Sequence, residues 1–127
     1  MTGALPLAGK VVAIVGTGSD ADRAIAVACA EAGADLALAT ESSERDQDYG
    51  MNSIANEIWA IGREHFVRVL DGAAGVEDLV AEARERFGRC DAIVARDGFA
   101  SGLDLPIVSK GGEPSEVARA VLAAAIG

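Results

Sequence analysis

A short glycine-containing turn near the start of the chain holds the residues best placed to do chemistry. It runs from Gly16 to Asp22 and includes Gly18, Ser19 and Asp20, between an apolar run that predicts a strand and a segment that predicts a helix. Such a turn points backbone N–H groups at an anion, and a dinucleotide pyrophosphate is an anion that it commonly holds. Glycine is required where phosphates press against the main chain, but Asp20 and Asp22 stand in such places. The turn therefore predicts the fold of a dinucleotide-binding protein, but its two aspartates argue against binding of a dinucleotide.

The same residues can be interpreted as a helix cap. Ser19 followed three residues later by Asp22 matches a capping box, in which the helix satisfies its own free N–H groups and fills the anion site itself. A helix N-terminus attracts a carboxylate by about 0.3–1 kcal/mol, whereas two like charges about 4 Å apart repel by about 1–4 kcal/mol. We therefore expect NAD(P) to bind weakly or not at all, unless a metal ion or a shifted pose relieves the repulsion.

Residues 10–26, KVVAIVGTGSDADRAIA, resemble the short-chain dehydrogenase/reductase family, whose turn reads TGxxxGxG where this chain has VGxxxDxD. The similarity continues through residues 31–40, 67–72, 82–98 and 112–125, and so covers most of the chain. It implies the N-terminal half of a Rossmann-type domain, or a domain whose middle is deleted, because relatives continue with further strands that carry catalysis. The resemblance also implies which residues would contact a cofactor.

After the second predicted strand, the family has an Asp for the ribose of NAD or basic residues for the phosphate of NADP, and this chain has Thr40 and Glu41. Asp71 matches an adenine-contacting Asp, although an Asp-Gly pair is also an ordinary turn. Of the family's NNAG motif, only Gly98 is present. The candidate cofactor-binding residues are therefore Gly16, Gly18, Ser19, Asp20, Asp22, Glu41, Asp71 and Gly98.

The catalytic residues that the resemblance implies are not found. The family uses a Ser with a Tyr-x-x-x-Lys pair, in which the Lys lowers the tyrosine pKa while nicotinamide passes a hydride. Here the only tyrosine is Tyr49, with Ser53 four residues later, and the only lysines are Lys10 and Lys110. The predicted strand order places Tyr49 and Lys110 on opposite sides of the first strand. No catalytic residue is therefore assigned in this chain.

The elements that must position these residues follow from the apolar runs. Strands are expected at 11–15, 36–39, 66–70 and 91–95, and helices at 20–32, 53–61 and 76–87. Alternating strands and helices predict one α/β domain over residues 1–127: a three-layer, Rossmann-like parallel sheet in the order 3-2-1-4. Arg68 suits an edge strand. Residues 41–50 are interpreted as a solvated connection, residues 99–112 as a loop, and residues 114–126 as a last helix.

Other chemistry-bearing residues have simpler interpretations. His65 precedes the third strand, at the end of the sheet opposite the usual ligand site, and is expected to be structural. Cys29 and Cys90 lack metal-ligand spacing and are expected to be buried, so no metal site is predicted. The net charge of -9 disfavours nucleic-acid and membrane-surface roles. The start of the chain does not resemble a signal peptide, so a cytoplasmic location is expected.

Self-association is expected from the side of the sheet where relatives have more strands. Strand 91–95 would be an apolar edge, and helix 114–126 is apolar on two faces. Either a homodimer or a related subunit would cover them. Two functions remain open: a catalytically incompetent protein of this family that acts by binding, or an NAD(P)-dependent oxidoreductase that takes its catalytic residues from another chain.

Overall fold

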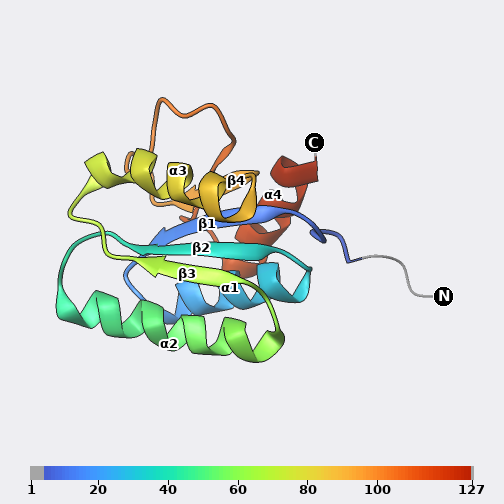
Figure 1. The fold of residues 1–127 in the computed structure, drawn as a ribbon, viewed down its shortest axis with the longest axis horizontal. Coiled ribbons are helices and arrows are strands. Elements are labelled where there is room, and N and C mark those ends of the chain that lie inside the picture. The colour runs from blue at the N-terminus through green and yellow to red at the C-terminus, as the bar shows by residue number, and fades with distance from the viewer. Residues whose placement is uncertain (1–4, 127) are drawn as a thin grey trace.

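A parallel five-stranded sheet in the order β3-β2-β1-β4-β5 forms the centre of the molecule (Figure 1). The structure is a computed structural model and describes residues 5–126. Every strand pair is parallel, and β1 pairs with β2 from Val11↔Asp35 to Gly16↔Thr40. The α/β fold class and the predicted order of the first four strands are confirmed. The strands are β1 (Val11–Gly16), β2 (Asp35–Thr40), β3 (His65–Arg68), β4 (Ala92–Ala95) and β5 (Ile107–Ser109).

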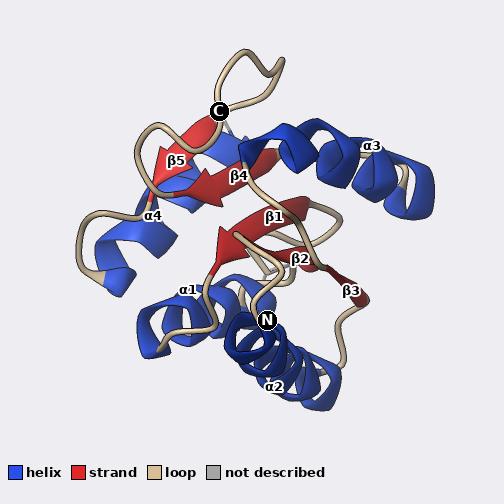
Figure 2. Cartoon of the chain, turned by 90° about the vertical axis from the view of Figure 1, so that its left-hand side faces the viewer, coloured by secondary structure: helices blue, strands red, loops and turns tan. Residues whose placement is uncertain are grey.

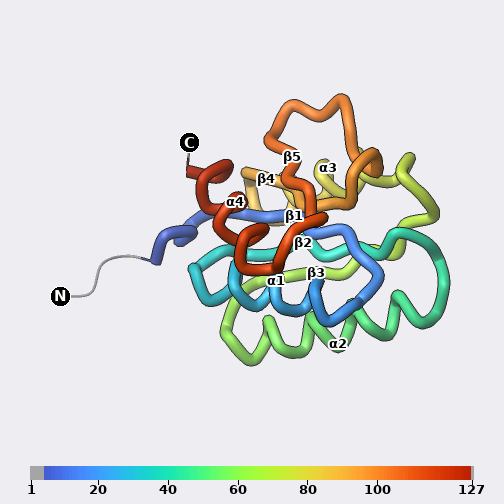
Figure 3. Tube along the Cα trace, turned by 180° about the vertical axis from the view of Figure 1, so that it is seen from behind, coloured from blue at the N-terminus to red at the C-terminus, as the bar shows by residue number. Residues whose placement is uncertain are grey.

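Helices cover both faces of this sheet, as Figure 2 shows. On one face lie α1 (Asp20–Glu31), α2 (Arg45–Ile61) and α4 (Pro114–Ile126), and on the other lies α3 (Val76–Phe87), preceded by the short helix η1 (Ala73–Gly75). Seen from behind in Figure 3, α4 and α2 lie on either side of α1, which contacts both. The predicted three layers are therefore confirmed.

The central strand explains why both faces must be covered. All six residues of β1 are buried, with Val12 and Ile14 in the core beneath α1 and Val11, Ala13 and Val15 in the core beneath α3. A continuous apolar run of this kind is typical of a parallel strand packed on both sides. Burial of β1 fixes the turn that follows it, at the carboxyl edge of the sheet.

The second helix is longer than expected. It begins at Arg45, so residues 45–50 of the predicted connection at 41–50 are helical. Asp46 and Asp48 lie in the first turn, where acidic side chains interact favourably with the helix dipole. The sequence did not predict this start because Gly50, a poor helix former, lies between the charged segment that ends at Asp48 and the apolar spacing that begins at Ile54. The other predicted boundaries lie within two residues of the observed ones, and those of α3 and α4 coincide with them.

The predicted loop at 99–112 contains a strand. β5 pairs with β4 in the register Ile93↔Ile107 and Val94↔Val108, so the prediction that strand 91–95 is an edge is wrong. A strand of three residues is too short to show a period, and only Val108 of the three is buried. The edges of the sheet are β5 and β3, and the prediction that Arg68 lies on an edge strand is confirmed.

The last helix buries one side. Val117, Val121 and Ala125 are buried against the core that α1 covers, Leu122 is partly buried there, and Ile126 is 59% exposed. Of the second apolar face expected on α4, only Ile126 is a large side chain that is exposed; the others on that face are small or partly buried. None of the helices formed by residues 5–126 is both long enough and apolar enough to cross a bilayer.

Candidate functional site

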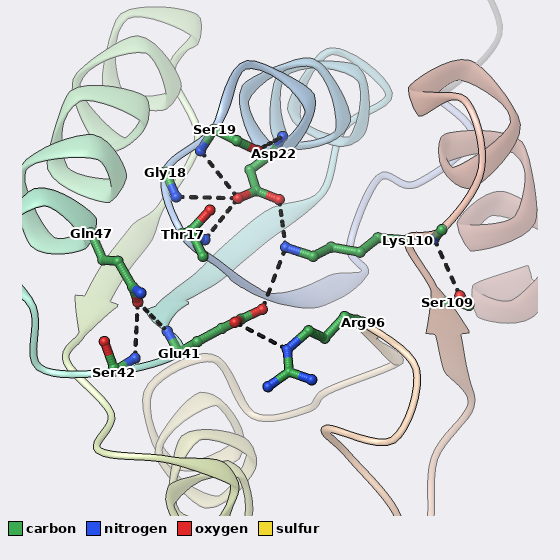
Figure 4. Close-up of polar contacts among 11 residues, drawn as sticks. Thr17, Gly18, Ser19, Asp22, Glu41, Ser42, Gln47, Arg96, Ser109 and Lys110 are labelled. Carbon is green, nitrogen blue, oxygen red and sulfur yellow. Dashed lines mark hydrogen bonds and ion pairs between the residues drawn. The ribbon is translucent and has the colours of Figure 1, made fainter.

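The candidate residues of the glycine turn meet at the carboxyl edge of the sheet, where α1 begins (Figure 4). In open parallel sheets this edge, beside the strand at which the order reverses, is the usual place for ligands. β1 leads directly into the turn, and Glu41 and Lys110 follow β2 and β5. The sheet therefore brings together residues that are far apart in the sequence.

The Asp22 carboxylate lies at the centre of this site and is 1% exposed. Its Oδ2 accepts hydrogen bonds from the backbone N–H groups of Thr17 at 2.9 Å, Gly18 at 3.1 Å and Ser19 at 3.2 Å. The Asp22 N–H donates to Ser19 Oγ at 3.1 Å, and the predicted capping box is confirmed. The carboxylate thus occupies the concave cluster of N–H groups that such a turn could offer to an external anion.

Two glycines of the turn are required by contacts within the chain. A Cβ on Gly16 would lie 2.2 Å from Asp22 Oδ2. Gly18 has a φ of 82°, and a Cβ there would lie 2.5 Å from the Cα of Gly50 in α2. The space at these glycines is therefore taken by the Asp22 side chain and by the backbone of α2.

Lys110 supplies the charge that balances Asp22. Its Nζ donates to Asp22 Oδ1 at 2.9 Å and lies 3.7 Å from Glu41 Oε2, while Arg96 Nε donates to Glu41 Oε1 at 3.1 Å. The Lys110 side chain is 15% exposed. Two acidic and two basic side chains therefore alternate across the site, and their formal charges cancel.

The pKa of Asp22 reflects this environment. Burial alone raises the pKa of the carboxyl, but the hydrogen bond and charge of Lys110, with the N–H donors of Thr17 and Ser19, outweigh it and hold the pKa below its ordinary value. Asp22 is consequently ionised at neutral pH and acts as an internal anion.

A dinucleotide pyrophosphate does not fit these residues. The N–H groups of Thr17, Gly18 and Ser19 already donate to Asp22 Oδ2. A phosphate at the turn would also face the ionised Asp22, with Asp20 in the first turn of α1 adding to the repulsion. The turn has the backbone shape of an anion site, and the chain supplies the anion.

The remaining predicted cofactor residues lie at the same edge. Glu41 is 13% exposed at its side chain and bonded to two cations, so its carboxylate is already used. Asp71 is exposed beside Gly72, whose N–H donates to the Glu41 carbonyl at 3.0 Å. Gly98 has a φ of 80° in the turn closed by Phe99 N–H to Arg96 O, at 3.1 Å. Their contact with a cofactor stays a prediction.

The structure does not assemble a catalytic tyrosine and lysine. Tyr49 projects from α2 and is 64% exposed, while Lys110 is bonded to Asp22. Ser53, also on α2, accepts a hydrogen bond from Arg23 Nη2 at 2.9 Å. Tyr49 is thus exposed to solvent, and Ser53 and Lys110 are each bonded to a residue other than the tyrosine.

Sequence reasoning assigned no role to Lys110 or Arg96. A buried carboxylate requires a counter-charge, so a buried Asp22 predicts that a basic side chain lies beside it. Lys110 directly follows the last residue of β5, Ser109, the position from which a side chain reaches the carboxyl edge of a parallel sheet. Lys110 could therefore be recognised as this partner only once residues 107–109 were known to form a strand.

Histidine and cysteine lie apart from this site. His65 starts β3, at the opposite edge, with Nδ1 3.2 Å from the Arg63 carbonyl oxygen. Cys29 and Cys90 are buried as predicted, and burial raises the pKa of their thiols to about 12 and about 11. Within residues 5–126, no three His, Cys, Asp or Glu side chains are grouped so as to hold a metal ion.

Comparison with known proteins shows similarity to solved structures alone. No family model matches the sequence, and no curated protein matches it. The chain is similar to a short-chain type dehydrogenase/reductase from Mycobacterium marinum, with 23% identity and a TM-score of 0.62 over 97% of this chain and 52% of that one. It is also similar to carveol dehydrogenase from Mycobacterium avium in complex with NAD, with 24% identity and a TM-score of 0.63 over 73% of this chain and 37% of that one.

Levodione reductase has 33% identity and a TM-score of 0.58, over 72% of this chain and 35% of its own length. The chain thus spans about half of the first of these proteins and 35–37% of the other two. These similarities support a Rossmann fold like that of short-chain dehydrogenases.

Proposed function

We propose that this protein is a divergent relative of the short-chain dehydrogenases whose Rossmann unit no longer works as a dinucleotide-dependent catalyst and acts by binding another protein chain. The observation that carries the proposed loss of cofactor use is the position of Asp22. Its carboxylate receives three backbone N–H groups and the ammonium of Lys110. A cofactor phosphate would have to displace an anion that is covalently part of the chain.

Electrostatics supports this interpretation. Two unit charges about 4 Å apart interact by about 4 kcal/mol at the effective dielectric of a protein surface, and a pyrophosphate at the turn would meet Asp22 and Asp20. The basic groups that could compensate are already paired, Lys110 with Asp22 and Arg96 with Glu41. Binding of NAD(P) is therefore expected to be weak or absent.

One observation favours a second function. Carveol dehydrogenase and a short-chain dehydrogenase from Mycobacterium paratuberculosis, both similar in fold, are bound to NAD. In the alternative, this chain is part of an NAD(P)-dependent oxidoreductase, and a tyrosine and lysine come from another chain. The two functions make opposite predictions about the aspartates of the turn.

Isothermal titration calorimetry with NAD+, NADH, NADP+ and NADPH tests the choice. Under our proposal the wild type binds with a Kd no tighter than about 1 mM, and the double variant Asp20→Gly with Asp22→Gly binds at least about tenfold more tightly. Asp20→Gly alone is the matched control, because it removes an exposed carboxylate and leaves Asp22 bonded to the turn. Circular dichroism confirms that each variant is folded.

The opposite result is equally informative. Micromolar binding of NAD(P) by the wild type, weakened by Asp22→Asn, would show that the aspartate is a ligand and would overturn the proposal in favour of the NAD(P)-dependent alternative. The Asn variant is used for this purpose because it retains the shape of the side chain and removes its charge.

A further inference from the structure

The backbone of β5 is paired on one side only. β5 ends the sheet on the side opposite β3, as Figure 2 shows. The Pro106 carbonyl accepts a hydrogen bond from β4 at 3.0 Å, and the Lys110 N–H donates one to β4 at 3.2 Å. The N–H and C=O of one strand residue point to the same side, and successive residues alternate, so Val108 also faces β4. Ile107 and Ser109 therefore direct their backbone groups away from the sheet.

These outward groups have no partner within residues 5–126. Neither the N–H nor the C=O of Ile107 or Ser109 is hydrogen-bonded to another described residue. The bond that Ser109 does make uses its side chain, whose Oγ accepts from the Gly111 N–H at 3.2 Å. Both residues are exposed, and Ile107 is a large apolar side chain that is 41% exposed. A strand edge with free donors and acceptors can pair with a further strand.

The features that commonly protect a strand edge do not protect this one. Pro106 precedes the strand, but its carbonyl points to β4, so the N–H that it lacks is missing on the inner side. The strand itself carries no charge. The nearest charged side chains are neutralised within the chain, Lys110 by Asp22 and Asp104 by Arg84, at 2.9 and 2.7 Å. Neither proline nor a free charge therefore excludes a further strand here.

The opposite edge of the sheet differs in this respect. β3 includes Arg68, whose Nη1 lies 2.7 Å from Glu82 Oε1 of α3, and it begins at His65. Charged side chains on an edge strand disfavour pairing with another strand. The two edges are thus unequal, and two copies joined through β5 would present only their β3 edges outward. Such a pair is closed, whereas pairing of unlike edges would continue into a fibre.

The sequence of β5 fits a second copy of itself. A twofold axis at Val108 makes the two strands antiparallel and places Ile107 of each copy opposite Ser109 of the other. Because both residues face outward, each such pair exchanges N–H···O bonds, and every open backbone group of β5 is satisfied. Val108 would lie beside its own copy, on the face that α4 covers. Lys110 would lie opposite Pro106, so no like charges meet.

We propose that the free edge of β5 is the self-association surface of this protein and that its occupant is the antiparallel β5 of a second copy. The inference names a partner for the binding function proposed above and rests on that function. It moves the apolar edge expected at strand 91–95 one strand outward, and it does not require helix 114–126. Because the paired strands are short, we expect a Kd of about 10 µM to 1 mM.

Sedimentation velocity over about 1 µM to 1 mM tests the proposal, and the wild type is expected to dimerise within this range. Ser109→Pro removes an outward N–H and no donor to β4, and Ile107→Lys adds a charge at the edge. Each should weaken the dimer at least about tenfold. Val69→Lys is the matched control, because it adds the same charge at a 48% exposed apolar residue beside β3. Circular dichroism confirms that each variant is folded.

Amide hydrogen exchange followed by NMR identifies the contact within the wild type. The N–H groups of Ile107 and Ser109 should exchange rapidly in dilute solution and become protected in concentrated solution, where the dimer forms. The Val108 N–H faces β4 and should be protected at both concentrations. This alternation distinguishes pairing of strands from packing of side chains, which would not protect every second amide.

Three outcomes would overturn the inference: a wild type that stays monomeric throughout, a dimer unaffected by both β5 substitutions, or a dimer in which the amides of Ile107 and Ser109 stay unprotected. The last would assign the contact to another surface. None of these outcomes alters the calorimetric result with NAD(P), so failure of this inference is distinguishable from failure of the proposed function.

Discussion

Lys110 Nζ lies 2.9 Å from Asp22 Oδ1, although the two residues are 88 positions apart in the chain. The contact joins the residue that follows β5 to the first turn of α1, across the carboxyl ends of β1 and β4. A short edge strand and the glycine turn are therefore held together by one buried ion pair. Stability, and not only charge balance, should depend on it.

Lys110→Met should lower the free energy of unfolding by about 2–3 kcal/mol, because Asp22 would keep its charge in a buried place without its cation. Urea denaturation at neutral pH measures the change. Arg119→Met, at an exposed position of α4, is the control and should change stability by less than about 0.5 kcal/mol. Equal effects of the two substitutions would contradict the structural role of the pair.

Acid should destabilise the protein through Asp22. Since its folded-state pKa is held below the ordinary value, the unfolded chain binds the proton more readily, and stability falls as pH drops from about 4 towards the folded pKa. Urea midpoints measured from pH 7 downwards should show this loss. Asp22→Asn should flatten the profile, and an unchanged acid limb in that variant would assign the loss to other carboxyls.

Gly18→Ala should destabilise the fold more than Gly98→Ala does. Both glycines have a positive φ, 82° and 80°, so each substitution costs about 1–2 kcal/mol in backbone strain. Only at Gly18 would the new Cβ also lie 2.5 Å from Gly50 Cα, whereas nothing lies within 4 Å at Gly98. Thermal denaturation of the two variants isolates the steric part, and similar melting temperatures would show that α2 moves aside freely.

The isolated chain should not oxidise NAD(P)H with a panel of ketones and aldehydes. Tyr49 is exposed on α2, and Lys110 is engaged by Asp22, so no lysine is positioned to activate the tyrosine. Absorbance of the reduced cofactor follows the reaction. Steady turnover that a substitution within this chain, such as Tyr49→Phe, abolishes would refute the prediction.

The capping box could be predicted from the sequence because Ser19 and Asp22 lie within one turn and need only each other. The contact with Lys110 could not, because it depends on which strand lies beside β4. Ile107–Ser109 is too short for its alternation to be recognised, and it forms a strand because β4 offers a partner. Local interactions were therefore predictable here, and the contact that balances the buried charge was not.

The same distinction explains the second helix. Ile54 and Ile58 predicted its C-terminal half from spacing alone, and both are buried. Its first turns contain Gly50, which is costly in an isolated helix but allows the backbone to approach Gly18. The contact with Gly18 thus outweighs the low helix propensity of Gly50, and only that propensity could be seen in the sequence.

The carboxylate in the turn also changes how the fold responds to its surroundings. A protein that holds a free anion gains stability by mass action, so its melting temperature follows the concentration of that ligand. Here the anion is Asp22, tethered three residues from the helix cap that it supports, and its local concentration never varies. Under the proposed loss of cofactor binding, the turn is uncoupled from nucleotide levels and keeps one shape whether nucleotides are scarce or abundant.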